Sequence, residues 1–154
     1  MAWEEAMREA LSLAREAGER GEVPVGAVVV LDGRVVGRGA NARESARDPT
    51  AHAELLAIQD AARTLGRWRL SGATLVATLE PCAMCAGAMV LARIDRLVLG
   101  ASDPKSGACG SLMDLSADPR LNHRFPVERG VLADEAGELL RAFFRARRGN
   151  GSPG

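Results

Sequence analysis

Residues 73–101 read ATLVATLEPCAMCAGAMVLARIDRLVLGA, and this stretch decides the fold. It opens with a short apolar run (73–79) that contains β-branched side chains, which predicts a buried strand. Residues 82–92 are small or apolar and predict a helix, and residues 96–101 (RLVLGA) predict a second strand. A strand, a helix and another strand in this order predict a parallel crossover, the unit from which α/β sheets are built.

The segments upstream predict further elements of the same sheet. In VGAVVVLDGRVVGRGAN (25–41), two β-branched runs flank Asp32-Gly33, a pair that tight hairpin turns favour because it accepts positive φ angles. Helical spacing of apolar residues marks residues 2–17 and residues 51–65. We therefore expect an α/β protein: a three-layer α/β/α sandwich around one mixed sheet, antiparallel at the hairpin and parallel across the later crossovers.

The C-terminal part of the chain has little periodic sequence before its last helix. Residues 102–127 predict a long loop with one short turn at SLMDL, and loops of this length are usually functional or disordered. Residues 134–147 predict the last helix, and GNGSPG (149–154) predicts a disordered tail. We expect a single domain over residues 1–148, because a chain of 154 residues can bury one core of ordinary size.

The composition excludes several classes of protein. Hydrophobic residues make up 47% of the chain and the formal net charge is zero, which excludes a disordered polymer and a strongly basic nucleic-acid binder. No segment approaches the roughly 20 apolar residues that cross a bilayer, and the acid-rich start lacks the apolar core of a secretory signal. The odd count of three cysteines argues for reduced thiols that can bind a metal. We therefore expect a cytoplasmic protein with no membrane segment.

Two of the cysteines predict a metal site. Cys82 and Cys85 are three residues apart, so they share one face of the predicted helix and fall in its first turn. There the helix dipole and the free backbone N–H groups favour the thiolate, which is the form that binds metal. Pro81 is compatible with a helix start. Taken alone, the pair also fits two cysteines that fill space in a core.

A histidine and an acid lie at the start of the preceding predicted helix. His52 and Glu54 stand two residues apart, and the interval from His52 to Cys82 can hold a helix, a turn and a strand that returns to the same sheet edge. His52, Cys82 and Cys85 can therefore meet. Glu54 can face a ligand held by His52 only if the helix begins at this point, because residues two apart on a helix point about 200° apart. The alternatives are a capping or core histidine and a first-turn acid that complements the helix dipole.

The two motifs together narrow the chemistry. Three nitrogen and sulfur ligands leave one position of a tetrahedral zinc site open for water, which distinguishes catalytic from structural sites. H-x-E followed by P-C-x-x-C is the known signature of zinc-dependent nucleobase deaminases, so the pattern is recognised and not deduced. It predicts one Zn²⁺ ion per subunit and a hydrolytic reaction, with Glu54 carrying protons beside the metal.

Beyond these motifs, the chain resembles the bacterial tRNA-specific adenosine deaminases over about residues 3–148. The resemblance rests on HAE and PCAMC and on GSLMDL, LNHRF, GVLADE and LLRAFFRARR, which set the chain apart from the cytidine and guanine deaminases that share the zinc motif. It implies a cytidine deaminase-like fold and hydrolytic deamination of the wobble adenosine of a tRNA anticodon to inosine. It also implies that His52, Cys82 and Cys85 bind zinc and that Glu54 is the catalytic proton shuttle for a zinc-bound water.

The resemblance also implies a set of substrate contacts. Asn41 would lie on the target base, Val25 against its face and the backbone around Ala53 beside the reacting atoms, whereas the loop after the last long strand would approach the sugar and backbone. Most of these positions have an ordinary alternative: a strand-ending turn for Asn41, a core strand for Val25 and a solvated loop for the residues after the last long strand. The loop residues concerned are Asp103, Lys105 and Ser106.

The last predicted helix combines aromatic and basic side chains. Phe144 and Arg147 suit stacking on flanking bases and contact with phosphate. Alternatively, the aromatic residues of this helix pack it onto the sheet, and its arginines form a solvated end that complements the dipole. The neighbours of the same kinds are Phe143, Arg145 and Arg148. The expected partner is a tRNA anticodon stem-loop, and the resemblance implies a homodimer whose interface helps to build the RNA site.

Two other functions remain open from the sequence alone. One is a deaminase of free bases or nucleosides of the guanine or cytidine type, and the other is a non-catalytic, zinc-stabilised RNA-binding subunit. The acid at Glu54 favours catalysis, and the basic aromatic helix favours an RNA substrate. Two residues stay outside the predicted site: Cys109 is expected to be an unpaired loop thiol, and His123 a hydrogen-bonding residue.

Overall fold

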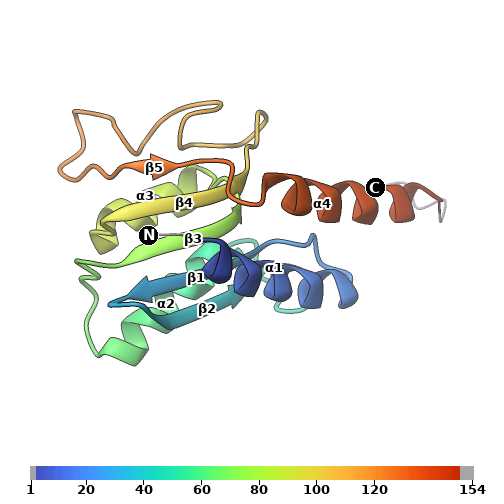
Figure 1. Cartoon of the computed structure of the whole chain (residues 1–154), viewed down its shortest axis with the longest axis horizontal. Coiled ribbons are helices and arrows are strands. Elements are labelled where there is room, and N and C mark those ends of the chain that lie inside the picture. Colours follow the sequence, from blue (N-terminus) through green and yellow to red (C-terminus); the bar gives the residue numbers. More distant parts are fainter. Residues whose placement is uncertain (1–2, 150–154) are drawn as a thin grey trace.

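The computed structural model describes residues 3–149, in which helices pack against a central sheet (Figure 1). The strands are β1 (Gly26–Leu31), β2 (Arg34–Ala40), β3 (Thr74–Leu79), β4 (Arg96–Ala101) and β5 (Val127–Glu128). The helices are α1 (Glu4–Glu19), α2 (Ala53–Leu65), α3 (Ala83–Ala92) and α4 (Ala133–Gly149). Strands and helices alternate after the opening hairpin, as expected for an α/β protein.

The strand directions bring two helix starts to one edge of the sheet. The strand order is β2-β1-β3-β4-β5. β1 is antiparallel to both β2 and β3, so β2 and β3 run in the same direction, while β3, β4 and β5 are parallel to one another. Because α2 follows β2 and α3 follows β3, both helices begin at the same edge of the sheet.

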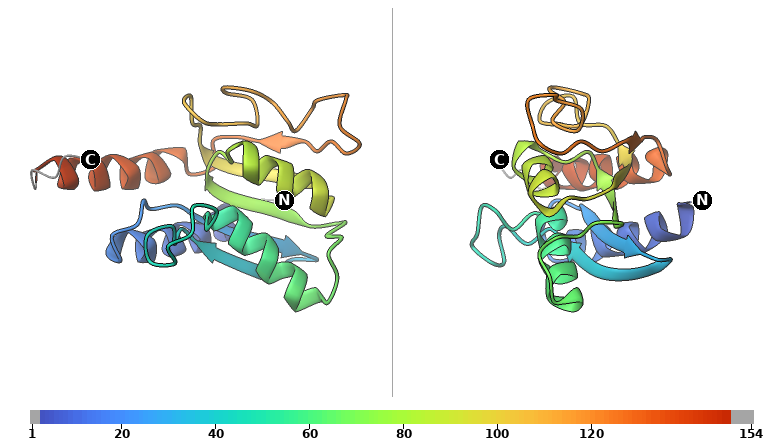
Figure 2. Two further views of the ribbon diagram at one scale, coloured as in Figure 1. Left: turned by 180° about the vertical axis from the view of Figure 1, so that it is seen from behind. Right: turned by 90° about the vertical axis from the view of Figure 1, so that its left-hand side faces the viewer.

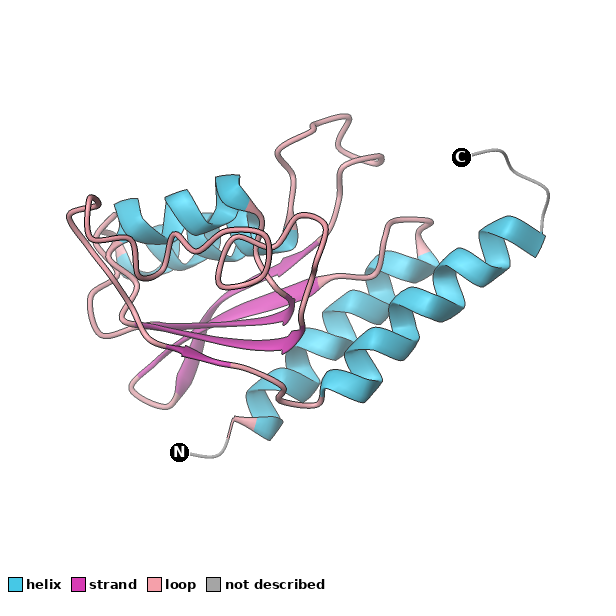
Figure 3. Cartoon of the chain, turned by 90° about the horizontal axis from the view of Figure 1, so that it is seen from above, coloured by secondary structure: helices cyan, strands magenta, loops and turns pink. Residues whose placement is uncertain are grey.

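Two pairs of helices cover the two faces of this mixed sheet. α1 and α4 lie side by side on one face, and α2 and α3 lie on the other (Figure 2 and Figure 3). Side chains along β1 alternate accordingly, because Ala27 and Val29 belong to the core under α2 and α3, whereas Val28 and Val30 belong to the core under α1 and α4. The predicted three-layer α/β/α sandwich is confirmed.

Two glycines in β2 let the backbone of α2 approach the sheet closely. A Cβ atom added at Gly39 would collide with the carbonyl oxygen of Ala53 and lie 2.7 Å from the backbone nitrogen of Ala57. One added at Gly37 would collide with the carbonyl oxygen of Ala57 and lie 2.7 Å from the backbone nitrogen of Ala61. The first turn of α2 therefore rests directly on β2, with no side chain between them.

The local predictions hold at the hairpin and differ at two boundaries. Asp32 and Gly33 form the turn with φ angles of 51° and 76°. β5 lies at the end of the segment predicted as a loop, because a two-residue strand has no alternation to detect. Gly149, expected in the tail, is the last residue of α4, and the rest of that predicted tail lies outside the described residues. Within residues 3–149, no helix has the length and apolar character to reach across a membrane.

Candidate metal centre and active site

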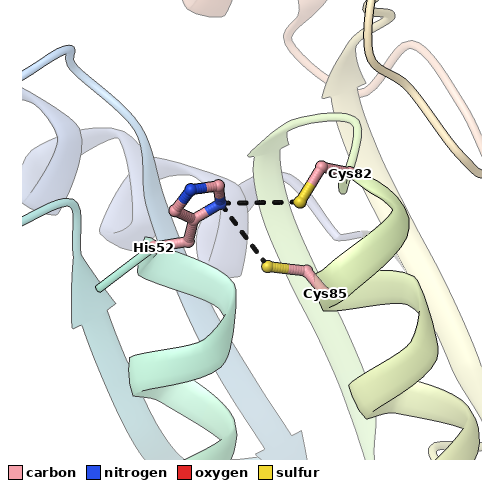
Figure 4. Close-up of side chains that lie close together, drawn as sticks. All are labelled: His52, Cys82 and Cys85. Atoms are coloured by element: carbon pink, nitrogen blue, oxygen red, sulfur yellow. Dashed lines mark hydrogen bonds between the residues drawn. The ribbon is translucent and has the colours of Figure 1, made fainter. Parts of the chain in front are cut away.

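The first residues of α2 and α3 carry the predicted ligands. His52 is the N-cap residue of α2, with extended backbone angles, so the helix begins immediately after it. Cys82 is likewise the N-cap residue of α3, and Cys85 follows in the first turn. The sequence placed Cys82 inside that turn, whereas the structure places it one residue before the helix. Since α2 and α3 begin at the same edge of the sheet, the three side chains converge (Figure 4).

The three donor atoms have the spacing of a tetrahedral metal site. Nδ1 of His52 lies 3.6 Å from Sγ of Cys82 and 3.7 Å from Sγ of Cys85. One ligand atom from each of the three residues lies within 4.8 Å of the other two. Zinc–nitrogen and zinc–sulfur bonds of ordinary length at a tetrahedral angle place nitrogen and sulfur about 3.6 Å apart. One imidazole nitrogen that faces two sulfurs at equal distance therefore fits a shared metal ion.

The start of α3 makes the two thiols unequal. The hydrogen bond from the Cys85 thiol, together with backbone N–H groups and His52, lowers the pKa of Cys82 to about 5, against the opposing effect of burial. The same hydrogen bond and burial raise the pKa of Cys85, which keeps its proton. The thiolate expected at both cysteines is therefore favoured at Cys82 alone, and mainly by the neighbouring Cys85 thiol.

Glu54 lies beside this cluster without belonging to it. Because α2 begins at Ala53, Glu54 stands in the first turn, which meets the condition under which it can face a ligand held by His52. Its side chain is buried, with 4% of the residue exposed. Burial, together with the negative charge of Cys82, raises the pKa of Glu54 to about 8, so the carboxyl group can hold a proton near neutral pH.

A pocket of about 210 Å³ opens onto these groups. Most of the predicted site residues line it, which brings together the helix starts, the beginning of β1, the end of β2 and the loop after β4. Its predicted members are Val25, Asn41, His52, Ala53, Glu54, Cys82, Asp103 and Ser106. Its other members, which the sequence did not single out, are Val23, Arg43, Leu79 and Glu80. The position of Glu80 directly before Pro81-Cys82 could have marked it as a residue near the site, whereas no sequence feature marks Arg43.

The remaining predicted substrate residues lie outside this pocket, in two adjoining grooves. Phe144 lines both grooves, while Lys105 lines one and Arg147 the other, which also includes Asn41 and Arg43. Phe144 is 43% exposed and its ring meets that of Phe143 edge to face, with centroids 5.4 Å apart. The end of α4 therefore borders the mouth of the pocket, because Asn41 and Arg43 line both the pocket and the groove.

The ordinary roles considered for these residues are present as well. The Asn41 side chain donates a hydrogen bond to the carbonyl oxygen of Val23 and accepts one from the backbone N–H of Arg43, as a strand-ending residue would. Asp103 accepts backbone hydrogen bonds from Lys105 and Ser106 through a single oxygen, Oδ1. Asn41 and Asp103 thus shape the pocket wall through the backbone that they organise.

His123 and Cys109, which the sequence left outside the site, both have local structural roles. His123 Nε2 lies 2.7 Å from the carbonyl oxygen of Ile94, which confirms its hydrogen-bonding role. Cys109 is unpaired, as expected, but it is buried and not an open loop thiol. Burial, followed by the nearby charge of Glu80, raises the pKa of Cys109 to about 12, so this thiol is inert at neutral pH.

Comparison with known proteins agrees with this geometry. The family model for the MafB19-like deaminases matches residues 1–148. The tRNA-specific adenosine deaminase of Bacillus subtilis is 52% identical over 142 residues, which cover 92% of this chain and 88% of that protein. A solved structure from studies of A-to-I editing by tRNA:A34 deaminases has a TM-score of 0.86 and 49% identity, covering 88% of this chain and 99% of that one. The guanine deaminase of Bacillus subtilis has a TM-score of 0.65 and 31% identity, covering 97% and 95% of the two chains.

The three-layer fold and the His-Cys-Cys cluster are those of a deaminase of the cytidine deaminase-like type. The chain belongs to the MafB19-like deaminase family. Its predicted resemblance to the bacterial tRNA-specific adenosine deaminases is confirmed by relatives of about half-identical sequence.

Proposed function

We propose that this enzyme hydrolyses the wobble adenosine of a tRNA anticodon to inosine, with water consumed and ammonia released. The observation that carries the proposal is the cluster of His52, Cys82 and Cys85, because His52 and Cys82 line a pocket that also contains a buried acid, Glu54. A purely structural metal site has no need of an acid that is costly to bury beside it. The relatives named for tRNA adenosine deamination support the choice of substrate.

His52, Cys82 and Cys85 would hold one zinc ion per subunit. A zinc ion held there would lower the pKa of a water molecule to about 7 and so supply a nucleophile at neutral pH. The ligand set fits zinc because imidazole and thiolate are its usual donors and because the nitrogen–sulfur distances of 3.6 and 3.7 Å match tetrahedral geometry.

Glu54 would carry the protons of the reaction. Its carboxylate would accept one proton from the water and deliver it to a ring nitrogen of adenine, while the remaining hydroxide adds to carbon six. It would then take the second proton from the hydroxyl group now on carbon six and deliver it to the amino group, so that the C–N bond breaks and ammonia leaves. Burial raises the pKa of Glu54 towards the working pH, and a group that titrates near that pH both gives and takes protons readily.

The pocket and grooves together suit a base that leaves a single-stranded loop. Val25 and Asn41 would contact the flipped base, with the backbone at Ala53 beside the reacting atoms. Asp103 and Ser106, which also line the pocket, would meet the sugar and backbone. In the adjoining grooves, Lys105, Phe144 and Arg147 would bind flanking nucleotides through charge and stacking.

The surface of α3 supports the proposal that two copies associate. This helix has the sequence AMCAGAMVLA, which carries no charged side chain. Leu91 is 71% exposed in the single chain. A helix that is apolar on all sides is normally covered on all sides. A homodimer through this helix would cover it, and we place the protein in the cytoplasm with its tRNA substrate.

The decisive experiment offers the purified, zinc-loaded protein an anticodon stem-loop with adenosine at the wobble position, beside free adenosine, cytidine and guanine. We expect inosine in the stem-loop, detected by mass, and little change in the free compounds. Deamination of free guanine without activity on the stem-loop would instead support the function of the more distant guanine deaminases. Stem-loop binding without any turnover would support the non-catalytic RNA-binding subunit.

Two variants assign the roles. Glu54→Ala should keep zinc and stem-loop binding while turnover falls by at least the 10² to 10⁴-fold that general acid–base catalysis contributes. Deletion of residues 141–154 should keep zinc but cripple turnover of the stem-loop. Retained turnover in Glu54→Ala would refute the proton-shuttle role, and full RNA activity in the truncated chain would refute the role of α4.

A further inference from the structure

Glu80 is a buried acid outside the metal cluster, on the segment that joins β3 to Cys82. Its side chain is fully buried, and its carboxylate is surrounded by donors from the loop after β4. Oε1 accepts hydrogen bonds from the backbone N–H of Asp103 at 3.1 Å and from the Ser111 hydroxyl at 2.5 Å. Oε2 accepts from the backbone N–H groups of Cys109 at 3.0 Å and Ser111 at 3.1 Å.

A single arginine completes this arrangement. Nη2 of Arg129 lies 2.9 Å from Oε1 of Glu80, and the same guanidinium donates to the carbonyl oxygen of Cys109 and to the hydroxyl of Ser102. The arginine side chain is 37% exposed, so the ion pair lies at the boundary between core and solvent. Arg129 thus contacts the loop from its solvent side, while the buried Glu80 contacts it from within the protein.

The loop backbone is built around this carboxylate. A Cβ atom at Gly107 would lie 2.5 Å from Oε2 of Glu80 and 2.5 Å from the carbonyl oxygen of Asp103. Only glycine leaves room for the carboxylate at that point. The same loop supplies Asp103 and Ser106 to the wall of the active-site pocket. One side chain therefore connects the segment before Cys82 with a loop that lines the same pocket.

We propose that Glu80 is a positioning residue, which holds residues 102–111 so that Asp103 and Ser106 face the substrate pocket. The distribution of its bonds supports this role, because three backbone N–H groups of one irregular loop converge on a single carboxylate. A loop without regular secondary structure has no ladder of its own to satisfy these donors. The consequence for substrate binding rests on the proposed function, whereas the ordering of the loop does not.

The test replaces Glu80 by Gln. An amide keeps the shape of the side chain, but its NH₂ group cannot accept a hydrogen bond, so at least two of the loop donors lose their acceptor. We expect amide hydrogen exchange in residues 102–111 to accelerate by at least about tenfold, with exchange in α2 and α3 unchanged. Zinc content should stay at that of the wild type, and KM for the anticodon stem-loop should rise by at least about tenfold with a smaller change in kcat.

Gly107→Ala provides a second route to the same loop, and Gly18→Ala provides the matched control. The added methyl group at Gly107 displaces the carboxylate, whereas the one at Gly18 makes only an ordinary contact, 3.5 Å from Pro24 Cβ. Gly107→Ala should reproduce the loop exchange and the KM effect, and Gly18→Ala should show neither. If Glu80→Gln fails to fold, Gly107→Ala alone decides the matter.

Two results would overturn the proposal. Exchange that accelerates equally in the loop, α2 and α3 would make Glu80 a residue of general stability, and an unchanged loop would remove its positioning role. Because exchange is measured without substrate, its outcome stands even if the protein proves inactive on the stem-loop. A faster-exchanging loop with unaltered KM would separate loop order from substrate binding and refute the second half of the proposal.

Discussion

Gly39→Ala should weaken zinc binding without touching a ligand. The methyl group would enter the space between β2 and the first turn of α2, against the carbonyl oxygen of Ala53 and 2.7 Å from the backbone nitrogen of Ala57. Ordinary van der Waals contact begins near 3.4 Å. Both neighbours are backbone atoms, so no side chain can turn aside, and the start of α2 must move by about 1 Å.

This shift has two separable consequences. Overpacking of a close contact costs about 1–3 kcal/mol of the free energy of unfolding. His52 immediately precedes the displaced turn, and metal–ligand distances tolerate only about 0.2 Å. We therefore expect zinc affinity to fall by about tenfold or more, and turnover to fall with it.

Gly37→Ala is the matched control. Its methyl group meets Ala57 and Ala61, one turn further from His52, with the same 2.7 Å approach to a backbone nitrogen. Denaturant unfolding of the metal-free proteins should give similar losses of stability for both variants. Competition with a chromophoric zinc chelator should show the larger loss of affinity for Gly39→Ala. Equal zinc affinity in the two variants would refute the idea that the contact between β2 and the first turn of α2 sets the position of His52.

Three further predictions follow from exposed or titrating groups. Phe144→Ala should leave the unfolding midpoint nearly unchanged, because Phe144 is 43% exposed. The substitution should weaken binding of the stem-loop, measured by fluorescence anisotropy, by about 5- to 100-fold because base stacking is lost. A variant that binds as tightly as the wild type would contradict this. If the protein forms the proposed homodimer through α3, Leu91→Glu should convert it to a folded monomer in sedimentation experiments, since Leu91 is 71% exposed in the single chain; a dimer that persists would place the interface elsewhere. Zinc affinity should fall by at least about tenfold for each unit by which the pH is lowered between about pH 8 and 6. The hydrogen bond to Cys82 and burial raise the pKa of Cys85, so zinc must displace the proton of this thiol and competes with protons more strongly as the pH falls. A zinc affinity that is independent of pH would show that Cys85 is already ionised.

Much of the site could be predicted because its signals are local. Cys82 and Cys85 share a helix start by spacing alone, and the backbone preference of Asp32-Gly33 defines the hairpin. The buried runs at 73–79 and 96–101 predicted the parallel pair β3 and β4. Side-chain periodicity and turn chemistry act over a few residues, so they can be read directly from the order of residues along the chain.

Other features depended on contacts between distant segments. Lys105 and Ser106 are neighbours in sequence, yet Ser106 lines the pocket and Lys105 lies in a groove beside α4. Glu80 stands directly before the Pro81-Cys82 motif, but its partners lie more than twenty residues further along the chain, with Asp103 the nearest of them. No local pattern predicts such partners, because they depend on where the loop after β4 returns.

The sequence by itself determined which donors could bind a metal and which segments would form the helices and the four longer strands. Only the tertiary structure decided that α2 and α3 begin immediately after His52 and Cys82, that these two helix starts meet, and that the end of α4 borders the same pocket. The physical reason is that the spacing of the ligands along the chain follows from the order of the residues alone. Their approach to within a few ångströms also requires the strand order β2-β1-β3 and the close packing of α2 on the glycines of β2.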